Sequence, residues 1–470
     1  MDQITSPPAA TTSPVSENRG SAALIAALVL AAVACQLCIS MPTPALPDIA
    51  TRLHTTTGTI GLAQALFFLA GGLLSVIMAA YSDHANTRKL MAASMVTAVV
   101  GALLAAAAPT VAVFIVGRVM QSTSAAVFPL ALRVMRQTLA PRQFGKAMGL
   151  ITAANGGIVG LDGLLSGWLT DHYGFRFVFV AMAVFGVVTV VVLLRWLPEL
   201  QPSASGKLDW PGLLLLSLGL AFVELGIGSA STSPFGVVAG MIVAGILLFG
   251  AFVVVEKRRP NPLIPTVYLR SRQAWPVLLT STFVTAGILS TINFIVPVFS
   301  QNATIGFGMT ATVSALVFIV PVCLVNVGFA PVIGAIAPRI GWRRMLRFSM
   351  AGTVPVLAVL ALGLRTEWLV ITMVTLVGFG LAGAMTPLNG LSAILAAPES
   401  PSVLPGINSA AYGLGSSLGF VLAAQVASAI QPVSVDGYRN AIWLAAGLIA
   451  AGFISSMLIS GRNQHAGEQI

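Results

Sequence analysis

Long apolar runs follow one another along almost the whole chain, and they constrain its fold more than any other feature. A helix that spans a bilayer needs roughly 20 predominantly apolar residues. Runs of this kind lie at 22–46, 58–80, 90–108, 111–134, 146–169, 175–197, 210–229, 234–255, 275–299, 310–336, 344–363, 367–396, 404–430 and 438–460. Only 8% of the 470 residues are charged, against about 25% in a soluble domain. The sequence therefore predicts an all-α polytopic membrane protein with 14 transmembrane helices.

The basic residues between the runs are distributed unequally over the two faces of the membrane. If the N-terminus lies inside, the inner segments hold most of them, and the outer segments hold only Arg52, Arg176, Arg365 and Arg439. A cytoplasmic excess of Lys and Arg is the general rule. We therefore expect both termini in the cytoplasm and the chain in the cell (plasma or inner) membrane. The basic clusters are short and lack interleaved aromatic residues, so the net charge of +10 does not indicate a nucleic-acid partner.

A weak internal repeat divides the chain into two halves. Segment 82–90 resembles 337–345, and segment 140–149 resembles 397–406. Parallel halves with a substrate site between them are a known plan of secondary transporters. The predicted organisation is a disordered cytoplasmic tail, an N-terminal six-helix bundle, a linker with two extra transmembrane helices, a C-terminal six-helix bundle and a second cytoplasmic tail, at 1–20, 21–198, 199–260, 261–461 and 462–470.

Several short motifs match those of a known transporter family. The loop after the second run pairs an acidic residue with basic ones, namely Asp83, Arg88 and Lys89. The fourth run holds an arginine followed by Gln and small residues, namely Arg118, Gln121, Ser122 and Ala125. With segments 45–49, 297–306 and 413–419, these motifs make the chain resemble the major facilitator superfamily, and within it the fourteen-span drug:proton antiporter family. The resemblance implies a major facilitator fold, two six-helix bundles plus two bridging helices, that works by alternating access.

The chain departs from that family at positions that touch proton coupling. Cys38 stands where the family usually has an acid in the first helix. Asp162 and Gly163 stand where the fifth helix of antiporters usually has Gly-Pro. The loop motif also has Asn86 in place of its usual glycine. The first two departures leave the direction of transport open.

Three charged residues lie deep within predicted spans: Arg118, Asp162 and Glu224. An intramembrane charge is costly and marks a functional site by default, so we expect these three residues to serve proton coupling. Arg118 and Asp162 are about equally far from the loop that joins their helices, which predicts a paired charge site. The alternative is a buried ion pair that only fixes the two helices. For Glu224, which has small residues on its helix face, a structural role is also open.

Polar and small residues supply the other candidate sites. We expect an inner gate formed by Asp83, Arg88, Lys89, Arg339 and Arg343. The candidate substrate cavity is lined by Gln121, Asn155, Ser166, Asn293, Asn389 and Asn408. Glycines at helical spacing predict a close helix contact through Gly156, Gly160, Gly163 and Gly167.

The resemblance implies a secondary active transporter, and we expect proton-driven efflux of amphipathic small molecules such as drugs, dyes or toxic compounds. The alternative is a proton-coupled uptake carrier for a small organic metabolite, and a third class is a receptor or scaffold that transports nothing. No phosphate-binding glycine loop with Lys is present, and the four histidines lack metal-ligand spacing. We therefore expect no enzymatic activity, no metal and no cofactor, with the proton gradient as energy source. The expected partners are the substrate, the proton and the lipid bilayer, and the expected functional unit is a monomer.

Overall fold

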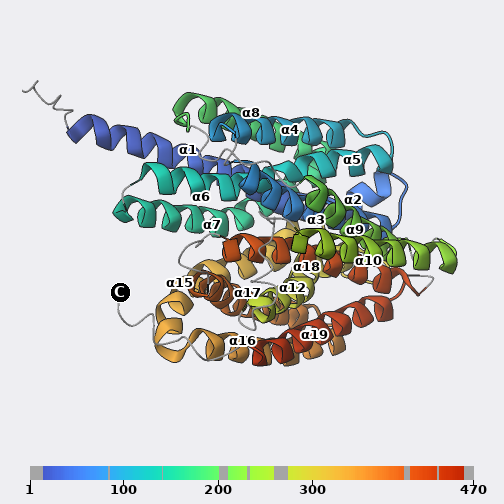
Figure 1. Ribbon diagram of the computed structural model, residues 1–470. Coiled ribbons are helices and arrows are strands. Elements are labelled where there is room, and N and C mark those ends of the chain that lie inside the picture. The colour runs from blue at the N-terminus through green and yellow to red at the C-terminus, as the bar shows by residue number, and fades with distance from the viewer. Residues whose placement is uncertain are drawn as a thin grey trace, which may run out of the picture.

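The computed structural model describes residues 14–82, 85–139, 141–200, 210–229, 233–258, 274–395, 403–430 and 433–459. All regular elements within these ranges are helices (Figure 1). The N-terminal half contains α1 (Pro14–Ser40), α2 (Pro42–Arg52), α3 (Thr57–Tyr81), α4 (Thr87–Ala107), α5 (Val111–Gln121), the 3₁₀ turn η1 (Ser122–Ala126), α6 (Val127–Thr138), α7 (Pro141–Tyr173) and α8 (Phe175–Trp196).

Two further helices connect this half to a second one. They are α9 (Trp210–Gly228) and α10 (Phe235–Arg258). The C-terminal half contains α12 (Ala274–Ser290), the π-helical turn η2 (Thr291–Ile295), α13 (Val296–Gln301), α14 (Ala311–Ser314), the π-helical turn η3 (Ala315–Ile319), α15 (Val320–Ile340), α16 (Trp342–Leu362), α17 (Glu367–Ile394), α18 (Val403–Ser428) and α19 (Val435–Met457).

Within the described residues, 12 helical segments are long and apolar enough to cross a membrane. The predicted count of 14 is therefore not confirmed. Apart from the short α2, the helices that fall outside the 12 are α7 and α9. α7 is 33 residues long but carries Asp162, one serine and several glycines, and the apolar run of α9 is shorter, at Leu214–Ile227.

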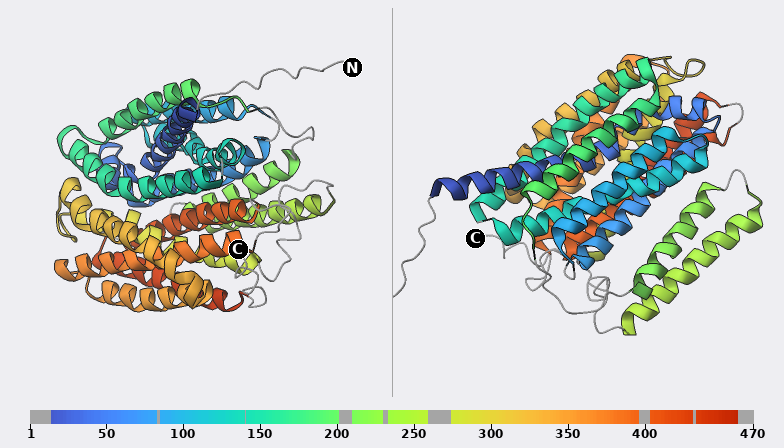
Figure 2. Two further views of the ribbon diagram at one scale, coloured as in Figure 1. Left: turned by 90° about the vertical axis from the view of Figure 1, so that its left-hand side faces the viewer. Right: turned by 90° about the horizontal axis from the view of Figure 1, so that it is seen from above.

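The two halves lie against each other along two lines of contact (Figure 1). On one line α3 packs against α18, and on the other α7 packs against α14 and α15. The hairpin of α9 and α10 lies to one side of the bundle, where α9 contacts both α3 and α18 (Figure 2).

The helices alternate in direction, so the bundle has two distinct ends. We call the end where α1 begins and α19 ends the basic end, because the helix termini there carry Arg88, Arg195, Arg258, Arg343 and Arg347. The other end, which holds the turns at 53–56, 108–110, 302–310 and 363–366, is called the opposite end. Sequence analysis predicts that the basic end faces the cytoplasm.

Candidate functional site: the break in the first helix

The site is organised around a break between α1 and α2. Pro42 follows the break and has no backbone N–H, so the carbonyl of Cys38, four residues earlier, cannot receive its normal helical hydrogen bond. Arg118 supplies the missing donor, because its Nη1 lies 3.1 Å from the Cys38 oxygen. A proline in the first span thus creates the acceptor that the arginine of α5 uses.

Arg118 is buried, with 1% of its surface exposed. Its guanidinium N–H groups donate hydrogen bonds to two further acceptors. Nη2 donates to Gln64 Oε1 at 2.8 Å, and Nη1 also donates to Gln121 Oε1. The guanidinium lies 4.1 Å from the centre of the Phe67 ring, a cation–π contact. These contacts compensate the cost of burying a positive charge.

Asp162 binds the same break from the other side. The Ser40 hydroxyl donates to Asp162 Oδ2, and one turn further along α7 the Ser166 hydroxyl donates to the Met41 carbonyl. Asp162 is 2% exposed. Its second oxygen, Oδ1, has no hydrogen-bond partner among the described residues.

The contacts of Ser40 suit either protonation state of Asp162. The Ser40 hydroxyl also lies 2.8 Å from the Gln36 carbonyl, but it has a single proton to donate. When Asp162 is ionised, that proton points at the carboxylate. When Asp162 is protonated, the acid can donate to Ser40, and Ser40 can donate to Gln36.

The predicted ion pair between Arg118 and Asp162 does not form. The ion pairs between described residues are those of Arg52 with Asp48, Arg88 with Glu199, and Arg439 with Asp436. Arg118 and Asp162 instead bind two different atoms of the same turn of α1. Equal distance from the connecting loop does not reveal the position of α1, which lies in contact with both side chains.

The candidate cavity residues fall into separate environments. Gln121 and Ser166 are buried and bonded inside the N-terminal half, where Gln121 Nε2 also contacts Met182 Sδ at 3.4 Å. In the C-terminal half Asn408 Nδ2 donates to Asn389 Oδ1 at 3.3 Å, and Asn293 is half-buried in η2.

Asp83 lies outside the described residues, as do the side-chain surroundings of Asn155, Gly156 and Glu224.

An aromatic layer joins the halves at this depth. The rings of Phe68 and Phe420 stack with centres 5.2 Å apart, and Phe294 lies 6.0 Å from Phe420. Nearby, the Ser417 hydroxyl donates to the Ala65 carbonyl across the same contact at 2.9 Å. Sequence reasoning did not identify Gln64 or Ser40, although the proline at position 42 indicates that an outside donor is needed near Cys38.

Among the described residues of the predicted gate, Arg88 and Lys89 lie in one half and Arg339 and Arg343 in the other. Arg88 lies 3.6 Å from Glu199 and donates to the Leu194 carbonyl, and both partners belong to its own half. Asn86 caps α4 by accepting from the Lys89 backbone at 3.2 Å. Arg339 and Arg343 lie around the turn between α15 and α16, and no described contact joins them to Arg88.

Gly160, Gly163 and Gly167 of α7 face the C-terminal half. A Cβ at Gly160 or Gly163 would make ordinary contact with Cys323 or Ile319, at 3.5 and 3.4 Å. A Cβ at Gly167 would lie only 2.6 Å from Thr312 Cα, so the backbones of α7 and α14 approach closely at the opposite end.

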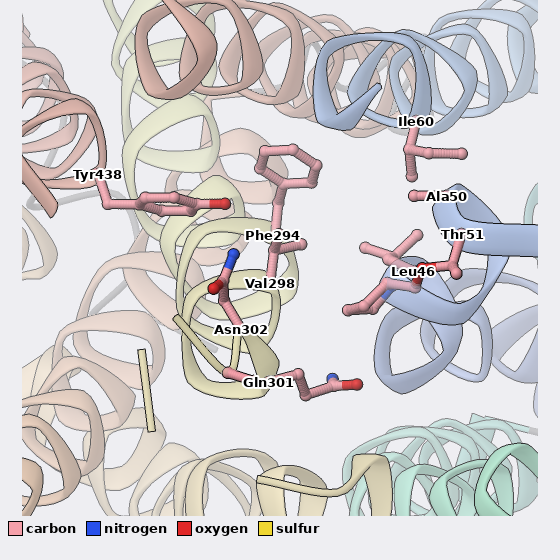
Figure 3. A pocket seen from close by; sticks show the side chains of 11 residues that line it. Leu46, Ala50, Thr51, Ile60, Phe294, Val298, Gln301, Asn302 and Tyr438 are labelled. Carbon is pink, nitrogen blue, oxygen red and sulfur yellow. The ribbon is translucent and has the colours of Figure 1, made fainter. Parts of the chain in front are cut away.

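A cavity of about 310 Å³ lies between the halves at the opposite end (Figure 3). One wall is formed by α2 and Ile60, and the other by Phe294, Gln301 and Asn302 together with Tyr438. Its volume is at the lower limit for ligand pockets.

Comparison with known proteins identifies the family. The model of the Major Facilitator Superfamily matches residues 28–420. This chain belongs to the major facilitator superfamily. The resemblance inferred from the motifs is confirmed, and the chain is a multi-pass membrane protein of a transporter family.

The relatives within the superfamily differ in their substrates. A uridine/deoxyuridine transporter of Lactococcus lactis is 31% identical over 459 residues, which cover 94% of this chain and 96% of that protein. A multidrug resistance protein B homolog of Mycobacterium tuberculosis is 26% identical over 410 residues, 84% of this chain and 74% of that protein. The crystal structure of the nucleoside transporter NupG has a TM-score of 0.65 at 13% identity, covering 93% of this chain and 100% of that one, which shows a shared fold.

Proposed function

We propose that this chain is a proton-coupled carrier for a small, neutral, polar organic solute, with nucleosides as the first class to test. The observation that carries the proposal is the whole-length similarity, at 31% identity, to a uridine/deoxyuridine transporter. The substrates named for that relative are small organic metabolites, so the similarity favours a carrier for such a metabolite over an exporter of drugs.

The interior chemistry supports a neutral solute. Arg118 is 1% exposed and three of its five N–H donors bind acceptors of the protein, so its charge is not presented to an anionic substrate in this conformation. Gln64 Nε2 and Asn408 Oδ1 are buried without a hydrogen-bond partner among the described residues, and they provide one donor and one acceptor. The cavity wall itself contains the aromatic side chains of Phe294 and Tyr438, which suit contact with a flat ring.

Asp162 is the candidate proton carrier. In the described parts of the two six-helix halves it is the only buried acidic side chain. Its contact with Ser40 can be made in both protonation states, as a coupling group requires. Arg118 holds the same turn of α1 and is the candidate group that connects protonation to movement of that helix. A coupling role for Glu224 stays a prediction.

The test is transport in proteoliposomes with an imposed pH gradient. We expect labelled uridine to accumulate when the compartment outside the vesicle is acidic, and a proton ionophore to abolish the accumulation. Exposed Asp436, which pairs with Arg439 within one helix, offers a matched control. Asp436→Asn should accumulate uridine normally, whereas Asp162→Asn should not. Gradient-driven export of a dye without any uridine flux would contradict the substrate assignment.

Efflux of amphipathic compounds is the second candidate function. It is favoured by the similarity to the multidrug resistance protein B homolog and by the apolar layer of Phe68, Phe294 and Phe420. The same vesicles loaded with ethidium distinguish the two functions, since a drug exporter would move the dye against its gradient.

We also infer 14 membrane spans with both termini in the cytoplasm. α7 is 33 residues long, about 50 Å at 1.5 Å per residue. It packs against α1, α8 and α15, which are candidate membrane spans themselves. α9 packs along α10, which is itself long and apolar enough to span.

A further inference from the structure

Two helices of the C-terminal half are interrupted in the same way near the opposite end. η2 precedes α13 and η3 precedes α15, and in both cases a proline, Pro297 or Pro321, follows the π-helical turn by two residues. Proline removes the N–H that would bond the carbonyl four residues earlier. π-helical turns are frequent at functional sites. The segment between the two interruptions, Val296–Ser314, is here called the tip.

The tip is held together internally. The Ser300 and Ser314 hydroxyls lie 2.7 Å apart, which joins α13 to α14. The Met309 backbone donates to the Ser300 carbonyl at 3.0 Å, and the Asn302 side chain accepts from the backbone of Thr304 at 2.9 Å. The tip can therefore move as one unit about its two interruptions.

A carboxylate of the N-terminal half binds this unit. Asp171, near the end of α7, accepts from the backbone N–H groups of Ala311 and Thr312, both at 2.9 Å, and from the Thr312 hydroxyl. Among the described residues it is the only acidic side chain that bonds to the other half. Gly167, one turn earlier, permits the close approach of α7 that this contact needs.

The charge of Asp171 strengthens the contact. Burial raises the pKa of its carboxyl, but hydrogen bonds from Thr312 and Ala311 lower it further, so that it lies below its usual value. The group is therefore ionised at neutral pH, and its bonds to backbone N–H groups are charge-assisted.

The tip also lines the cavity between the two halves. Val298, Gln301 and Asn302 form one wall of the cavity between the halves, across from Thr51 of α2 (Figure 3). Displacement of the tip would widen this cavity toward the opposite end, and the contact of Asp171 opposes that displacement.

We propose that Asp171 is a positioning residue for transport, which fastens the tip to the N-terminal half and sets how often the opposite end opens. This inference rests on the transport function proposed above. Asp171 does not touch the cavity, so its role is to set the balance between two conformations.

The test measures opening without any substrate, so its result is independent of the substrate assignment. Ile60 lines the cavity and is 2% exposed, and the three native cysteines are buried. Ile60→Cys protein in lipid nanodiscs is treated with a bulky hydrophilic maleimide, which reaches both faces. In this background we expect Asp171→Asn to raise the labelling rate about tenfold, the effect of losing one charge-assisted hydrogen bond, and Asp171→Glu to restore most of the slow rate.

Asp48 gives a matched control at the same end. Its carboxylate accepts from the Phe175 backbone at 2.8 Å, but both residues belong to the N-terminal half. Asp48→Asn, combined with Ile60→Cys, should leave the labelling rate near that of the Ile60→Cys parent. If Asp171→Asn is not recovered as folded protein, Thr312→Val removes one of the three bonds and should raise the rate about threefold. Parental rates in the Asp171 and Thr312 variants, or an equal rise in Asp48→Asn, would overturn the proposal.

Discussion

Arg118 and Asp162 bind the same turn of α1 without touching each other. The Arg118 guanidinium donates a hydrogen bond to the Cys38 carbonyl, and the Asp162 carboxylate accepts one from the Ser40 hydroxyl two residues later. Opposite charges from α5 and α7 are thereby both connected to the end of one helix. A change of protonation at Asp162 would act on α1 directly, rather than by breaking an ion pair.

Arg118→Ala should destabilise the protein strongly. The substitution leaves three buried acceptors, on Cys38, Gln64 and Gln121, without their donor, and each such loss costs about 1–3 kcal/mol. We expect the unfolding temperature in detergent to fall by at least about 5 °C and coupled transport to be lost. Arg118→Lys should restore little of the stability or transport, because an ammonium group cannot reproduce the geometry of the planar guanidinium. Arg176→Ala, which removes two bonds to backbone carbonyls near the opposite end, is the control, and an equal temperature shift in both would count against the special position of Arg118.

Asp162→Asn should separate binding from coupling. The amide keeps the shape and can still accept from Ser40, but it carries no titratable proton. We expect downhill exchange of substrate to continue at a rate within about threefold of the parent, while accumulation driven by a pH gradient disappears. Asp162→Glu should keep part of the accumulation. Undiminished accumulation by Asp162→Asn would place the proton site elsewhere, with Glu224 as the next residue to substitute.

Pro42→Ala should weaken the contact between Arg118 and α1. An N–H at position 42 can bond the Cys38 carbonyl within a continuous helix, so it competes with the guanidinium. Transport should slow several-fold although the protein becomes no less stable to heat. Pro355→Ala, which removes a proline inside α16, should leave transport unchanged. Normal transport by Pro42→Ala would show that the break in the helix is dispensable.

Gly167→Ala should interfere with packing at the opposite end. Its Cβ would meet backbone atoms of Thr312 and Ala311 at 2.6 and 2.8 Å, and backbone cannot rotate out of the way. Overpacking of this kind costs typically about 1–3 kcal/mol, so we expect a lower unfolding temperature and slower transport. Gly160→Ala, with its nearest neighbour at 3.5 Å, should be tolerated. Similar behaviour of the two variants would mean that α7 and α14 separate easily.

The predicted topology can be tested by labelling the segment 257–272. A cysteine introduced at Arg270 should react with an impermeant maleimide only when the cytoplasmic face is exposed, and tags at both termini should behave alike. Reaction in intact cells would exclude the arrangement of 14 spans with cytoplasmic termini.

The sequence predicts the individual helices better than it predicts their contacts. Arg118 and Asp162 can be identified from the sequence, because a charged residue within a long apolar run is evident without knowledge of the fold. Their pairing was wrong, because distance along a helix does not reveal which neighbour lies around its circumference. The contact of Asp171 with Thr312 depends on the register between two halves that are about 140 residues apart in sequence, and no local pattern encodes that register.

Because the α9–α10 hairpin lies on one side of the bundle, the two contact lines between the halves differ in what separates them from the lipid. α9 packs along the line where α3 meets α18, whereas the hairpin makes no comparable contact with the line where α7 meets α14 and α15. The hairpin therefore separates one contact line between the halves from the lipid, whereas along the other line α7 packs directly on the C-terminal half through the buried Gly160, Gly163 and Gly167.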